Sequence, residues 1–191
     1  MKQAALIILV TLLVLAGGSV FLSRQLTNKT AAPGGKLAET QMPEISPELT
    51  LLPEVTQVSV GDQVVFTVSI TAGANQVIGT ETYLNFKPDV LTNVRLTPGD
   101  LFNDPEELLK VIDPVQGKIS YALGTLTPKV GNGQVFKISA DLIASPTIAQ
   151  NVLTFDQQNT KVALMSADGQ TRYDEQQIKV IFKEVPISVL P

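Results

Sequence analysis

The hydrophobic pattern from residue 48 onward has a period of two, which is typical of half-buried β-strands. In the segment 63–71 every second residue is apolar and would face a core, namely Val64, Phe66, Val68 and Ile70. The segments 134–143 and 177–183 alternate in the same way, with inward positions at Phe136, Ile138, Ala140 and Leu142 and at Ile178, Val180 and Phe182. Further strands are expected over residues 51–60, 78–86, 91–96, 109–112, 118–123, 152–155 and 161–165.

Turn-forming residues separate these segments. They gather at 61–62, 72–75, 98–100, 116–117, 131–133 and 168–169, and such clusters favour turns. Roughly nine short strands with frequent turns predict an all-β fold, a nine-stranded β-sandwich. The one helical signal is the stretch 104–107, where Asp104 would cap a single turn and Glu107 would return the hydrogen bond. This cap accounts for the adjacent carboxylates Glu106 and Glu107 better than acid–base catalysis does.

An uncharged apolar stretch precedes the strands. Residues 4–22 carry no charge, and a helix of about that length crosses the roughly 30 Å hydrocarbon core of a bilayer. We therefore expect a hydrophobic helix over residues 1–23, either a transmembrane anchor or a signal peptide cleaved near the small residues 16–19. Both alternatives export the rest of the chain. The expected location is the cell membrane, single-pass with the domain extracellular, or, for the signal peptide, the secreted fraction.

The segment 24–47 is predicted to be a disordered linker. It is polar, shows no sustained period, and contains Pro33, Gly34, Gly35, Pro43 and Pro47. The β-sandwich is then expected over residues 48–184, and residues 185–191 are expected to form a C-terminal tail.

Composition excludes most catalytic chemistry. The chain of 191 residues has no Cys and no His, so it lacks the commonest general base and the commonest transition-metal ligands. Its net charge of −4, without a run of Lys or Arg, gives no basic stripe for nucleic acid. We expect a non-enzyme with no cofactor, no metal site and no nucleic-acid partner. A loop calcium is the alternative, with turn residues as its candidate ligands: Asp100, Asp104, Asp168 and Asp174.

The segment 79–91, with the sequence GTETYLNFKPDVL, carries the candidate binding residues. In a strand, Leu84 and Phe86 would face the core, while Glu81, Tyr83 and Asn85 would share the opposite face. An acid, an aromatic ring and an amide in one row suit contact with another protein. Ordinary polar residues turned to solvent are the alternative reading of the same pattern.

Five segments, in this order, resemble the cohesin domain, the receptor module of cellulosome scaffolds. They are GDQVVFTVSI at 61–70, YLNFKPDVL at 83–91 with TPGDLF at 97–102, GKISYAL at 117–123, FKISADLIA at 136–144 and MSADGQ at 165–170. The resemblance covers residues 51–182, nearly all of the expected domain. It implies a nine-stranded β-sandwich with jelly-roll topology that performs no chemistry. It also implies noncovalent binding, through one flat sheet face, of a dockerin, a small helical module that carries its own calcium.

The resemblance also assigns roles to residues. Glu81 falls where many cohesins place an acidic contact residue, and Tyr83 and Asn85 share its face. Ser120 and Ala122, the outward residues of the GKISYAL strand, are expected to flank the same surface. Two positions depart from the family pattern: Gly79, where a side-chain amide is often found, and Lys87, which replaces a common aspartate.

Three functions remain open from the sequence. The resemblance implies a surface module that captures dockerin-bearing proteins and is linked to polysaccharide degradation. The alternatives are a carbohydrate-binding β-sandwich and a structural surface domain. The chain has no Trp and only three tyrosines, of which Tyr121 lies on an inward row, so few rings are left to stack on a polysaccharide.

Overall fold

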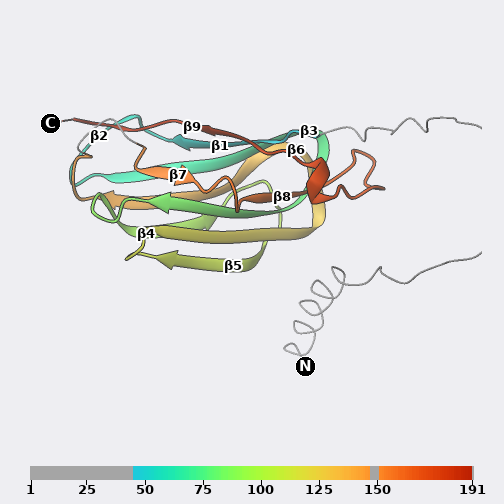
Figure 1. Ribbon diagram of the computed structural model, residues 1–191, viewed down its shortest axis with the longest axis horizontal. Coiled ribbons are helices and arrows are strands. Elements are labelled where there is room, and N and C mark those ends of the chain that lie inside the picture. The colour runs from blue at the N-terminus through green and yellow to red at the C-terminus, as the bar shows by residue number, and fades with distance from the viewer. Residues whose placement is uncertain (1–44, 147–150, 191) are drawn as a thin grey trace, which may run out of the picture. The chain divides into compact units, whose positions relative to one another are not determined.

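The computed structural model describes residues 45–146 and 151–190, and in these residues the fold is an all-β, sandwich-like one (Figure 1). The hydrophobic helix expected over residues 1–23 and most of the linker expected over 24–47 lie outside the described residues. Within the described part of the chain, no helix is long and apolar enough to cross a membrane. The elements are β1 (Glu48–Pro53), β2 (Gln57–Ser59), β3 (Gln63–Phe86), β4 (Leu91–Pro98), β5 (Glu106–Asp113), β6 (Lys118–Leu142), β7 (Leu153–Phe155), β8 (Lys161–Met165), the 3-10 helix η1 (Glu175–Gln177), β9 (Ile181–Glu184) and β10 (Ser188–Leu190).

Two long strands, β3 and β6, belong to both layers of the sandwich. In the first layer the strand order is β9-β1-β3-β6-β4, and β1 pairs with β3 from Glu48–Thr71 to Pro53–Phe66. In the second layer the C-terminal half of β3 pairs with β7 and β8 on one side and with β6 on the other, and β5 follows β6 at the edge. Figure 1 shows β9 beside β1 at one side of the domain and β5 at the opposite side.

The turns predicted at 72–75 and 131–133 are wrong. β3 and β6 stay paired on both sides of these glycine-rich segments, with a register shift between Thr71 and Gln76. Gly73 has φ +62° and Gly131 has φ +91°, and a Cβ on Gly131 would lie 3.0 Å from the Gly73 carbonyl oxygen. Both strands therefore bend at the same place, where glycine allows the close approach. The bend carries the pair from one layer into the other instead of ending it.

The predicted alternation places the core correctly. All four inward residues of 63–71 are at most 3% exposed, and Tyr121 is fully buried as expected. Rings from the two layers meet in the core: Tyr121 and Phe136 pack edge to face with centroids 5.0 Å apart, and Phe155 contacts Phe182 at 5.1 Å. Since β3 and β6 each contribute to both layers, one contiguous core joins the layers.

The helical turn predicted over 104–107 is also wrong, because Glu106 begins β5. Glu107 lies opposite Leu123 of β6, accepts a hydrogen bond from the Tyr121 hydroxyl, and forms an ion pair with Lys110 at 3.1 Å. The Tyr121 hydrogen bond, followed by the Lys110 ammonium, lowers the pKa of Glu107. Backbone pairing with β6 satisfies more hydrogen bonds than one capped turn would, so tertiary contacts override the local signal.

The C-terminal region differs in detail from the expected strand 177–183. The 3-10 helix η1 ends at Gln177, and the regular strand β9 begins only at Ile181. The inward residues of that segment, Ile178, Val180 and Phe182, are partly buried against the core. Residues beyond 184 continue into β10, which pairs with β2, and the described residues contain ten strands where nine were expected. The jelly-roll connectivity stays a prediction.

Two buried threonines on the inward side of β3 give a stability test. Within the described residues, the hydroxyls of Thr80 and Thr82 have no hydrogen-bond partner, and Thr82 is fully buried. Residues 41–191 form one compact unit, which we call the 41–191 unit. Burying an unpaired hydroxyl costs about 1–3 kcal/mol, so Thr82→Val is expected to stabilise this unit by about 1 kcal/mol. Thermal unfolding followed by circular dichroism measures this as a rise in Tm. Thr160→Val is the matched control and should lower Tm, because the Thr160 hydroxyl bonds the Tyr83 backbone. A lower Tm for Thr82→Val would contradict the prediction.

Candidate functional site

The pairing of β3 with β6 brings the five predicted binding residues onto one face. Residues directly opposite each other on antiparallel strands share a face of the sheet. The opposite pairs are Glu81 with Ala122, Tyr83 with Ser120 and Asn85 with Lys118. The structure thus places all five residues together on the solvent side of the second layer.

The edge strand β5 extends this surface with residues that the sequence did not single out. Its outward residues lie opposite those of β6, namely Leu109 by Ala122, Val111 by Ser120 and Asp113 by Lys118. We call the surface formed by these residues, the β3 row, and Leu108 with the Gly124 beneath it the outer face: Glu81, Tyr83, Asn85, Leu108, Leu109, Val111, Asp113, Lys118, Ser120, Ala122 and Gly124. By the alternation rule applied to the other strands, the apolar Leu109 and Val111 would face the core, so the pattern of 109–112 did not predict their outward position. Nothing local to the sequence indicated which strand lies beside β6.

The outer face is polar along β3, and along β5 it is apolar except for Asp113 at the end of the strand. Val111 is 49% exposed and Leu108 is 60% exposed, whereas Ala122 is only 9% exposed. Leu108 lies over Gly124, because a Cβ on that glycine would come within 3.2 Å of the Leu108 Cδ1. Ala122 and Gly124 therefore keep the middle of the surface flat, and Ala122 offers less contact area than expected.

The structure gives a reason for the glycine that departs from the family pattern. Gly79 of β3 pairs with Gly124 of β6, and a Cβ added at Gly79 would lie 2.8 Å from the Leu123 carbonyl oxygen. Because the two backbones approach so closely, no side chain fits at this position without a shift of the strands. At the other departure, the Lys87 carbonyl oxygen accepts hydrogen bonds from the Val90 and Leu91 amides and so holds the turn after β3.

Glu81 and Tyr83 act as a coupled pair on the outer face. The Tyr83 hydroxyl donates a hydrogen bond of 2.6 Å to the Glu81 Oε1. This hydrogen bond, together with partial burial and the negative charges of Glu81 and Asp156, raises the pKa of Tyr83. The carboxylate is thereby fixed next to the ring, so the pair presents one oriented acceptor to a partner.

Alkaline titration tests this pair. A folded-state pKa above the ordinary value of about 10 means that the contact stabilises the fold fully below pH 10, and that this stability is lost as pH rises through the folded pKa. In the 41–191 unit, absorbance at 295 nm should show Tyr83, identified by difference from Tyr83→Phe, ionising above the ordinary range. Glu81→Gln should bring that midpoint down. An unchanged midpoint in Glu81→Gln would exclude the pair.

A polar hollow adjoins Tyr83 on the outer face. It has a volume of about 340 Å³, and its walls include Tyr83, Asn85 and Ser120, which were predicted, and Asp156 and Asn159, which were not. Asp156 and Asn159 belong to the turn between β7 and β8. Their contribution depends on a contact between segments more than 70 residues apart, so sequence periodicity could not reveal it.

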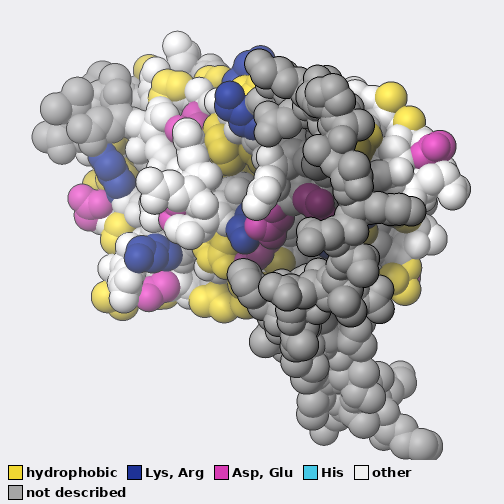
Figure 2. All heavy atoms as spheres, turned by 45° about the vertical axis from the view of Figure 1, so that its right-hand side comes forward, with side chains coloured by type: hydrophobic (Ala, Val, Ile, Leu, Met, Phe, Trp, Pro, Cys, Tyr) yellow, Lys and Arg dark blue, Asp and Glu magenta, His cyan; other side chains and the backbone are white. Residues whose placement is uncertain are grey.

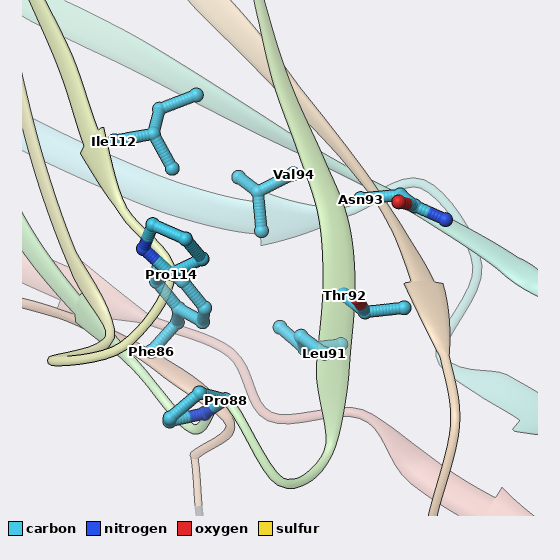
Figure 3. Close-up of a pocket in the computed structure, with 8 residues that line it drawn as sticks. All are labelled: Phe86, Pro88, Leu91, Thr92, Asn93, Val94, Ile112 and Pro114. Carbon is cyan, nitrogen blue, oxygen red and sulfur yellow. The ribbon is translucent and has the colours of Figure 1, made fainter.

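A second hollow, of about 320 Å³, lies between the edges of the two layers (Figure 3). Figure 3 shows Leu91 and Val94 of β4 on the side that faces Ile112 and Pro114, while Asn93 points away. Asn93 has φ +51° and donates a 2.7 Å hydrogen bond to Asp141. The resulting bulge in β4 turns Val94 toward the gap. The lining is mostly apolar, with Thr92 and Asn93 as its polar members, and it contains no charged group.

The described residues hold no group of three or more His, Cys, Asp or Glu that could bind a metal ion. Figure 2 shows acidic, basic and apolar side chains interspersed over the visible part of the described surface. Recognition on such a surface depends on local groups rather than on one broad field of a single sign. Asp168, one of the candidate calcium ligands, accepts hydrogen bonds from Ser166 and Gln170, which lower its pKa, and calcium binding by a loop stays a prediction.

The fold and its outer face define an all-β, sandwich-like module. The family model described as "Cohesin domain" matches residues 50–180. The chain therefore belongs to the cohesin family, and the resemblance seen in its sequence segments is confirmed. No curated protein matches the chain.

Solved cohesin structures share this fold. The type II cohesin A11 of Bacteroides cellulosolvens is 16% identical, with a TM-score of 0.59 over 75% of this chain and 99% of that chain. A type II cohesin–X–dockerin complex from Acetivibrio cellulolyticus gives 18% identity and a TM-score of 0.57, over 75% of this chain and 99% of that chain. The third ScaC cohesin of the same organism, in complex with a dockerin, is 14% identical, with a TM-score of 0.56 over 77% of this chain and 99% of that chain. At these identities the likeness shows the fold alone.

Proposed function

We propose that this cohesin domain is a non-catalytic module that captures a dockerin-bearing protein through its outer face. The observation that carries the proposal is the pairing of β3, β6 and β5, which gathers the predicted binding residues on one face of the sheet. Membership of the cohesin family supports it, as do the similar structures described as cohesin–dockerin complexes.

The outer face has the make-up of a protein-binding surface. Exposed Leu108 and Val111 provide apolar area along β5, and Ala122 keeps the centre flat. Glu81 and Tyr83 supply a hydrogen-bonding row along β3. Apolar area next to oriented polar groups is the usual arrangement of a specific interface, in which a few residues carry most of the binding energy.

The setting of the module is part of the proposal. The uncharged segment 4–22 would anchor the chain in the cell membrane or direct its secretion, and the polar segment up to residue 47 would hold the domain away from the bilayer. Captured proteins would then work outside the cell, and dockerin-bearing enzymes would link the module to polysaccharide degradation. Any calcium required would belong to the dockerin.

Affinity capture tests the proposal. The 41–191 unit, immobilised on beads, should retain a protein from the source organism's lysate or medium, and calcium chelation should release it. The captured protein should contain a dockerin. The double variant Glu81→Lys, Tyr83→Ala should retain at least about 30-fold less of it. Undiminished capture by the double variant would exclude the outer face as the binding surface.

Glycan beads distinguish the main alternative. In the described residues Tyr121 is buried, which leaves only Tyr83 and Tyr173 to stack on sugar rings. We therefore expect no retention of the 41–191 unit on cellulose. Retention on cellulose together with no captured protein would favour a carbohydrate-binding function. If the 41–191 unit neither captures a protein nor is retained on cellulose, a structural surface domain would be favoured.

A further inference from the structure

The turn between β7 and β8 is hydrogen-bonded to the backbone of Tyr83 at the edge of β3. β8 pairs with β3 up to Glu81, β7 pairs with it from Leu84, and no strand residue pairs with Tyr83 at this edge. The Thr160 hydroxyl fills the gap: it accepts a hydrogen bond from the Tyr83 amide at 3.0 Å and donates one to the Tyr83 carbonyl oxygen at 3.2 Å. The Asp156 amide donates a third hydrogen bond, of 2.8 Å, to the Tyr83 carbonyl oxygen.

Burial of Thr160 shows that this turn is packed against the edge of β3. Thr160 is only 5% exposed, and its hydroxyl replaces the backbone pairing that a continuous strand would supply. Asn159 closes the turn, because its Nδ2 donates a hydrogen bond of 2.8 Å to the Asp156 Oδ2. The Asp156 carboxylate is thus held at the rim of the polar hollow.

The hollow has a negative end and a positive end. Asp156 and Glu81 are both close enough to Tyr83 for their charges to raise the pKa of its hydroxyl. Lys161, which lies opposite Glu81, is engaged at 3.1 Å by Glu175. Lys118 lines the hollow from β6, across from Asn85. A cation would therefore be attracted to the Asp156 end and repelled from the Lys118 end.

Hydrogen-bonding groups and an aromatic side chain line the hollow. At one end Asp156 offers carboxylate lone pairs and Asn159 an amide oxygen, Asn85 offers an amide oxygen beside Lys118, and Tyr83 contributes an aromatic side chain to the same hollow. A planar guanidinium, with five donors and a flat face, matches this set better than a lysine ammonium does.

We propose that the polar hollow receives an arginine side chain from the partner, with its guanidinium at Asp156 and its stem along Tyr83. Such a contact gains from a charge-assisted hydrogen bond and from cation–π attraction. The inference rests on the proposed function for the partner that presents the arginine. Binding of an arginine side chain to the hollow can nevertheless be measured without the partner.

The test uses the full chain, labelled with 15N and held in detergent micelles. N-acetyl-arginine methylamide is titrated against N-acetyl-citrulline methylamide, which has nearly the same shape and no charge. The arginine probe should produce saturable shifts centred on the amides of Tyr83, Asp156 and Asn159, with an affinity at least about tenfold higher than that of the citrulline probe. Equal affinities, or shifts centred elsewhere, would overturn the proposal.

Three variants locate the charge that is responsible. Asp156→Asn should weaken the arginine probe at least about fivefold, while Asp104→Asn, an exposed carboxylate in the β4–β5 loop, should leave it unchanged. Lys118→Gln should strengthen the probe by about twofold or more, since it removes the repulsion. The Lys118 variant gives a reading even if Asp156→Asn disturbs the turn. Weaker binding in Lys118→Gln would contradict the proposed charge arrangement.

The two proposals fail in different ways. Arginine binding at the hollow together with no captured protein would leave the arginine site standing and reject the dockerin function. Capture of a dockerin that Asp156→Asn does not weaken would support the dockerin function and reject the arginine site.

Discussion

Gly117→Ala is expected to lower the free energy of unfolding of the 41–191 unit by about 3 kcal/mol or more. Gly117 ends the tight turn between β5 and β6 with φ +65°, a backbone conformation that costs an L-residue about 1–2 kcal/mol. A Cβ at this position would lie 2.1 Å from the Phe86 carbonyl oxygen and 2.9 Å from the Pro88 Cδ. Neither atom belongs to a flexible side-chain end, so the backbone itself would have to move.

The clash would also break a contact that joins the two long strands. The Phe86 amide donates a hydrogen bond of 2.7 Å to the Gly117 carbonyl oxygen at the point where β3 ends and β6 begins. Urea unfolding followed by circular dichroism measures the loss.

Gly73→Ala is the matched control for this prediction. Gly73 has nearly the same dihedral, φ +62°, but nothing lies within 4 Å of its would-be Cβ. Gly73→Ala should therefore lower the free energy of unfolding only by the conformational cost of about 1–2 kcal/mol. Equal losses in the two variants would show that the close approach at Gly117 contributes nothing.

Val111→Asp is expected to reduce affinity for the captured partner at least about 30-fold, or roughly 2 kcal/mol. Val111 is 49% exposed at the centre of β5 and lies opposite Ser120, beside the Tyr83 row. An interface over this surface would remove water from the new carboxylate without supplying a partner for it, which is costly. Because the side chain is half exposed in the free domain, Tm should change little.

Isothermal titration calorimetry with the purified partner measures this effect. Val55→Asp is the control, since Val55 is 60% exposed in the loop after β1, away from the outer face. Similar affinities for wild type and Val111→Asp would place β5 outside the interface and confine binding to the β3 and β6 rows.

Alternation along single strands was enough to assign the sides of most residues. The inward row of 63–71, the burial of Tyr121 and the outward row of Glu81, Tyr83 and Asn85 follow from a period of two. The reason is local: successive side chains of a strand point to opposite faces whatever the strand pairs with. The family resemblance added the expected use of the outward row.

Local turn and cap signals were less dependable. The residues 104–107 carry a good capping pattern, yet Glu106 and Glu107 pair with β6. The glycine-rich segments at 72–75 and 131–133 look like turns, yet they bend two strands that remain paired. In each case the local structure competes with a ladder of backbone hydrogen bonds to a distant segment. A local sequence pattern contains no information about that distant pairing.

The pattern of the chain itself therefore predicted the all-β class and the side that most strand residues face. It also predicted three residues of the outer face, namely Glu81, Tyr83 and Asn85. The neighbours of those residues were decided by the tertiary structure: Val111 across β6, and Asp156 and Thr160 across the edge of β3. A strand's period is a property of its own backbone. Which strand lies beside it depends on the packing of the whole core, and the binding surface is formed only when that packing brings the segments together.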